Sequence, residues 1–112
     1  MFSIAQSESY FWPVTVEIAV TGGTWKTEKF DAEFKRIPRD KLRSMHEAHA
    51  NGEMGDLEFI REILVGWKGI VDGADEVPFS QSAFERLMQN QSVVVGVVRA
   101  FTESATGAKR KN

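Results

Sequence analysis

The sequence predicts an α+β fold in which an N-terminal antiparallel β-hairpin is followed by about four helices, packed as one small domain. Two observations predict the hairpin: apolar and polar residues alternate over 13–20 and again over 29–35, and Gly22-Gly23 lies between these stretches. The remainder carries apolar residues at helical spacing. A chain of 112 residues, 42% of them apolar, has the size of one domain with a modest core.

The predicted hairpin covers residues 12–37 and follows a flexible N-terminus, 1–11. A two-residue loop at Gly22-Gly23 would set charged residues against the apolar face, because a slip of one residue turns every side chain to the other side. We therefore expect a three-residue loop, Gly22-Gly23-Thr24, or a bulge near Trp25. The expected pairs are Val16 with Phe30, Val14 with Ala32 and Trp12 with Phe34.

After the hairpin we expect helices at about 38–51, 56–65, 80–90 and 92–106. Pro38 fits the first turn of the first helix, and Asn51-Gly52 ends it. Asp56 is the expected cap of the second helix and Gly66 its expected C-terminal stop. The connection over 69–77 is expected to be exposed, with a turn at Asp72-Gly73-Ala74-Asp75.

The sequence predicts the third helix more clearly than the fourth. Ser80 suits an N-cap, and Phe79 and Phe84 are placed to contact each other as a hydrophobic staple. The β-branched run at 93–98 also suits a strand. We favour a helix there, because one helical face gathers Val94, Val97, Val98, Phe101 and Ala105. Residues 108–112 are expected to form a solvated basic tail.

Composition and motif spacing argue against an enzyme and against a bound cofactor or metal. The chain has no cysteine, which excludes disulfides and thiolate chemistry and suits a reducing cytosol. In His46-Glu47-Ala48-His49 the histidines are one residue closer than a zinc protease requires. The acidic group Asp72, Asp75 and Glu76 is too short for a calcium loop, and no glycine-rich phosphate loop follows a strand.

Charge and hydropathy give no reason to expect nucleic acid or a membrane as a partner. The formal net charge is −2, so no overall field attracts an anionic partner. Three basic residues in the tail give only weak, salt-sensitive attraction to nucleic acid. No window approaches the roughly 18 apolar residues of a membrane span, and no export signal opens the sequence. We therefore expect a soluble protein of the cytoplasm.

Aromatic residues are the candidates for contact with a protein partner, because aromatic side chains are enriched among the residues that dominate binding at interfaces. The candidates are Trp67, Phe79 and Phe101. Two roles are open for Trp67: it fills the space between hairpin and helices, or it is an anchor offered to a partner. We favour the core role.

Gly66-Trp67-Lys68-Gly69-Ile70, followed by Pro78-Phe79-Ser80, is the most specific motif of the chain. Together with the strand at 30–37 and the Lys-Arg-Lys-Asn end at 109–112, it resembles the tail assembly chaperones of long-tailed bacteriophages, a family often carried in prophages. The resemblance covers most of the chain from Trp12 onward. The turn at 72–76 departs modestly from the fuller Asp-Gly turn of the family.

The resemblance implies a non-enzymatic function in the host bacterial cytoplasm. Such a chaperone binds the tape measure protein, keeps it soluble, promotes assembly of the tail tube from its major tail protein, and is absent from the mature virion. Homo-oligomerisation and a longer frameshifted product stay open. The alternatives are a small structural tail or connector protein retained in the virion and a prophage regulator that binds nucleic acid through the basic tail.

Overall fold

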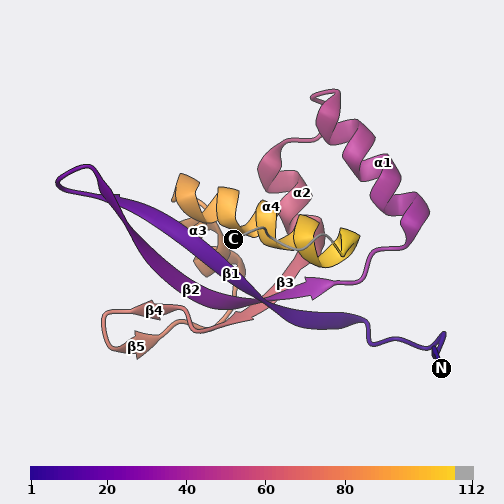
Figure 1. Ribbon diagram of the computed structural model, residues 1–112, viewed down its shortest axis with the longest axis horizontal. Helices are drawn as coiled ribbons and strands as arrows, with labels where there is room; N and C mark the ends of the chain where they lie inside the picture. Colours follow the sequence, from indigo (N-terminus) through magenta and orange to yellow (C-terminus); the bar gives the residue numbers. More distant parts are fainter. Residues whose placement is uncertain (108–112) are drawn as a thin grey trace.

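A long antiparallel hairpin forms the N-terminal third of the fold, as the computed structural model shows for the described residues, 1–107 (Figure 1). Its strands are β1 (Ser9–Val20) and β2 (Thr24–Lys35). The expected flexible N-terminus at 1–11 is therefore too long, because the strand already begins at Ser9 and Arg36 N–H donates to the Glu8 carbonyl at 2.8 Å. The predicted basic tail, 108–112, lies outside the described residues.

The hairpin register differs from the expected one by two residues. Phe30 lies opposite Val14 rather than Val16, and Phe34 lies opposite Tyr10 rather than Trp12. The loop has the expected three residues, but they are 21–23 and not 22–24. The residue added to Gly22-Gly23 is therefore the last one of the first stretch, and not the first one of the second. A displacement by two keeps every side chain on its face, which is why the apolar faces of both strands still coincide. The predicted face was right and the predicted pairs were wrong.

The sheet has a third strand that the sequence did not predict. The order is β1-β2-β3, with β3 (Leu64–Lys68) antiparallel to β2. The second helix, expected over 56–65 with a stop at Gly66, is α2 (Asp56–Ile63), and Gly55 rather than Asp56 is its N-cap. Helix α1 (Arg39–Ala50) precedes it and ends at Asn51 as expected.

The C-terminal half contains a short hairpin and two helices. Strands β4 (Val71–Asp72) and β5 (Asp75–Glu76) form the hairpin within the expected exposed connection. Helix α3 (Gln81–Leu87) is followed by α4 (Gln91–Thr106). The helical interpretation of 93–98 is thus confirmed, and α4 packs along β1. The result is an α+β fold whose helices α1, α2 and α4 lie on one side of the sheet (Figure 1).

The core lies between the sheet and α4. Phe34 and Phe59 pack edge-to-face on Phe101 of α4, with ring centroids 5.4 and 5.9 Å away. Helix α4 approaches β1 closely at Gly96, where an added Cβ would lie 2.7 Å from the Thr15 carbonyl oxygen. A glycine is needed at this contact, because the atom in the way belongs to the backbone.

Candidate partner-binding groove

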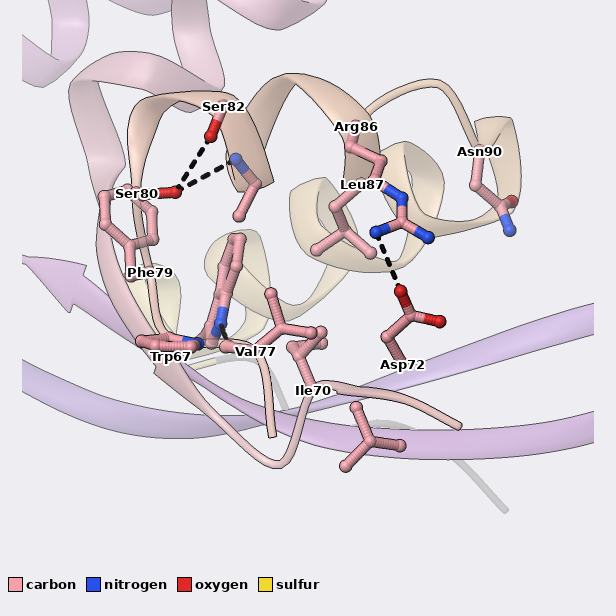
Figure 2. A pocket seen from close by; sticks show the side chains of 13 residues that line it. Trp67, Ile70, Asp72, Val77, Phe79, Ser80, Ser82, Arg86, Leu87 and Asn90 are labelled. Atoms are coloured by element: carbon pink, nitrogen blue, oxygen red, sulfur yellow. Dashed lines mark hydrogen bonds and ion pairs between the residues drawn. The ribbon is translucent and has the colours of Figure 1, made fainter. Parts of the chain in front are cut away.

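An apolar hollow lies between the segment 70–78 and helix α3 (Figure 2). We call it the Trp67 groove, and its volume is about 580 Å³. Eight of its thirteen lining residues are apolar, and the other five are polar or charged. The lining residues are Trp67, Ile70, Val71, Asp72, Val77, Pro78, Phe79, Ser80, Ser82, Ala83, Arg86, Leu87 and Asn90.

Trp67 forms the floor of the groove and holds the segment beside it. Strand β3 places this residue opposite Ala32, on the core face of the sheet, and its side chain is 8% exposed. The indole Nε1–H donates to the carbonyl oxygen of Val77 at 2.7 Å. The core role that we favoured is therefore confirmed, and the same ring also borders the groove.

Phe79 forms one side of the rim. Its ring meets Trp67 edge-to-face, with centroids 4.8 Å apart, and it remains 37% exposed. Ser80 caps α3 by accepting a hydrogen bond from Ala83 N–H at 3.1 Å. The Phe79 and Phe84 rings lie 6.3 Å apart, which confirms the predicted N-cap and staple. Cap and staple together fix the direction in which α3 leaves Phe79.

The β4–β5 hairpin forms the opposite rim. Val71 is 61% exposed, although it is apolar and adjoins the apolar floor. Asp72 Oδ2 pairs with Arg86 of α3 at 2.9 Å, so one ion pair joins the two walls (Figure 2). Both partners are well exposed to solvent. An exposed ion pair of this kind contributes at most about 1 kcal/mol, so it positions the hairpin only loosely.

The groove continues toward the long hairpin. A second hollow of about 180 Å³ shares Ile70, Val71, Leu87 and Asn90 with the first and reaches Val16, Ile18 and Phe30 of β1 and β2. The apolar surface is therefore elongated. It extends from Phe79 at one end to the apolar side chains of β1 and β2 at the other.

Two of the three predicted partner-binding residues meet at the groove, and the third does not. Phe101 is 2% exposed and lies among the core aromatics, so it offers no surface to a partner in this fold. The prediction for Phe101 was wrong because its helical face is the one that α4 buries against the sheet. Sequence reasoning missed Val71 and Leu87. The only signal for Val71 was an apolar residue within a turn-rich, polar segment.

The remaining polar clusters have structural roles. His49 Nε2 lies 2.6 Å from Asp56 Oδ1, and the rings of His46 and His49 pack against Phe59 with centroids 5.4 and 5.5 Å away. Within residues 1–107 no group of three or more metal-ligating side chains is found. The same part of the chain holds no buried polar or charged residue.

Comparison with known proteins identified no relative of this chain. No family model matches the chain, and neither the curated proteins nor the solved structures gave a significant match. Of the helices in the described part of the chain, none is both long enough and apolar enough to cross a bilayer.

Proposed function

We propose that this protein is a phage tail assembly chaperone that binds the tape measure protein in the host cytoplasm. It keeps that protein soluble, promotes assembly of the tail tube, and leaves before the virion is complete. The motif around Trp67 and Pro78-Phe79-Ser80 supports the choice of family. The single observation that carries the proposal is that this same motif, besides placing Trp67 in the core, borders an open and mostly apolar groove.

The shape of the groove suits an amphipathic helix. A helix with an apolar stripe cannot remain bare in water without associating, and an apolar groove covers such a stripe. Here a buried floor at Trp67 and exposed rims at Val71 and Phe79 offer apolar surface to one face of a helix. Tube subunits must later displace the chaperone. We therefore expect weak binding at each site, of micromolar order or about −8 kcal/mol, with avidity from many copies along one chain.

Co-expression with the tape measure protein of the same gene cluster tests the proposal. Wild-type protein should raise the soluble fraction of the tape measure protein several-fold over a control without it. The Val71→Gln variant should lose most of that effect, because it makes the rim of the groove polar. Its free energy of unfolding should change by no more than about 0.5 kcal/mol, since the side chain is exposed.

The matched control is Val20→Gln, which changes a valine that is 42% exposed at the tip of the long hairpin. This variant should solubilise the tape measure protein as well as wild type does. A tape measure protein that stays equally insoluble with and without the wild-type chain contradicts the proposal. Mass spectrometry of purified virions distinguishes the chaperone from the alternative of a structural tail or connector protein. That alternative requires stoichiometric amounts of this chain in the mature particle.

A further inference from the structure

We propose that the Trp67 groove takes a helix whose apolar stripe is flanked by lysine or arginine on the side that lies against the β4–β5 hairpin. This inference rests on the proposed function and names the chemistry of the partner segment. It is carried by the charges on the rim of the groove. A partner with acidic flanks would meet repulsion at the same place.

The rim at the β4–β5 hairpin carries more negative than positive charge. Asp72 lines the groove, and Asp75 and Glu76 are the strand partners of Asp72 and Val71, which both line it. The facing wall supplies the cation Arg86. Arg86 already pairs with Asp72 at 2.9 Å. Asp75 and Glu76 are exposed and make no ion pair or side-chain hydrogen bond within residues 1–107. Two uncompensated carboxylates therefore lie beside the apolar surface.

The part of the groove beside the long hairpin carries no excess of acidic residues. Glu28 and Lys29 border the second hollow there, one of each sign. Glu28 is already engaged, because its Oε1 pairs with Lys26 Nζ at 2.7 Å, and this hydrogen bond raises the pKa of Lys26. The carboxylates near the groove that have no ion pair within residues 1–107 are therefore those of the β4–β5 hairpin, Asp75 and Glu76. This asymmetry determines which side of a bound helix would carry the basic residues.

An elongated occupant fits the groove better than a compact one. The two hollows share Ile70, Val71, Leu87 and Asn90, so apolar contacts are available over a continuous stretch and not at one point. A helix presents residues at i, i+3, i+4 and i+7 along such a stretch, and its flanking residues reach the rims. Long basic side chains also cover apolar surface with their methylene stems while their charges reach the carboxylates.

Two synthetic amphipathic peptides test the charge preference directly. Both carry the same leucine stripe; one has lysines on the flanks, and the other has glutamates at the same positions. The lysine peptide should bind wild type more tightly, by several-fold and at most about thirtyfold, which is the range for two exposed ion pairs. The preference should shrink as salt is raised, because exposed charges are screened.

The decisive variant is Asp75→Lys with Glu76→Lys. It should lose or invert the preference for the lysine peptide. The control is Glu47→Lys with Glu53→Lys, which makes the same change in net charge at exposed sites on the α1 side. The control should retain the preference. Equal binding of the two peptides by wild type, or equal loss in both pairs of variants, overturns the inference.

Co-expression keeps this inference separate from the proposed function. If the Asp75→Lys, Glu76→Lys variant solubilises the tape measure protein as well as wild type does, the inference fails and the chaperone function stands. If wild type fails to solubilise that protein, the proposed function fails, whatever the peptides show.

Discussion

Two aromatic clusters of this fold have similar geometry and opposite relations to solvent. Phe34 and Phe59 meet Phe101 edge-to-face, and each of the three residues is at most 3% exposed, because α4, which carries Phe101, packs over the other two. Trp67 and Phe79 also meet edge-to-face, but beside a groove that no helix of the chain covers within the described residues. The packing around the first cluster is therefore completed by residues of the chain itself.

The difference is that one aromatic cluster is covered by the chain's own helix, whereas the other borders an open groove. Contiguous exposed apolar surface on a small protein marks an interaction site more often than a packing fault. The core cluster should therefore control stability and the groove should control binding. Substitutions that separate these two properties test the comparison.

The largest expected effect on stability is at Phe101. Its replacement by alanine should lower the free energy of unfolding by about 3–5 kcal/mol, because it leaves a cavity among fully packed rings. Phe79→Ala should cost only about 1 kcal/mol, since that ring is half-exposed and little cavity forms. Urea denaturation followed by circular dichroism measures both. Equal losses for the two variants would remove the distinction between core and groove.

The next largest effect is expected at Gly96. An alanine Cβ would lie 2.7 Å from the Thr15 carbonyl oxygen, so α4 must move away from β1. We expect Gly96→Ala to cost about 1–3 kcal/mol from overpacking, which exceeds the gain of up to about 1 kcal/mol in helix propensity. Val95→Ala, at an exposed site of the same helix, is the control and should change stability little. A stabilised Gly96→Ala variant would show that the contact is loose.

The smallest of these effects is expected at Ser80, on the groove side. Ser80→Ala removes the N-cap of α3 and should cost about 1 kcal/mol. The Ser44→Ala variant removes a hydroxyl that bonds the Asp40 carbonyl within α1 and should cost less than about 0.5 kcal/mol. Thermal unfolding compares the two. If Ser80→Ala leaves stability unchanged, the cap does not determine the position of the wall that α3 forms.

Local patterns predicted the helices and the hairpin faces, but not the pairings between distant segments. Both possible three-residue loops contain Gly22 and Gly23, which have φ of 100° and 78°, so the sequence could not say from which strand the third residue comes. The alternation of apolar residues fixes only which face each strand presents. Hence the face was predicted and the register was not.

Strand β3 was hidden by a helical pattern. Ile60, Ile63, Leu64 and Trp67 follow one another at helical spacing, so the pattern of α2 continues past its end. The strand forms because its backbone pairs with β2, with a bulge near Phe34, and local sequence does not record that contact. For the same reason the sequence predicted two residues of the groove, Trp67 and Phe79, but not the groove itself. The contact between these two side chains depends on the position of β3.

The most direct test of the account is the response of the three tryptophan indole N–H signals in nitrogen-15 NMR spectra when a soluble helical segment of the tape measure protein is added. Occupation of the groove should shift the signal of Trp67, whose N–H bonds Val77, and leave that of Trp25 at the hairpin tip in place. A shift of the Trp25 signal with an unmoved Trp67 signal would place the binding surface on the long hairpin and contradict the account.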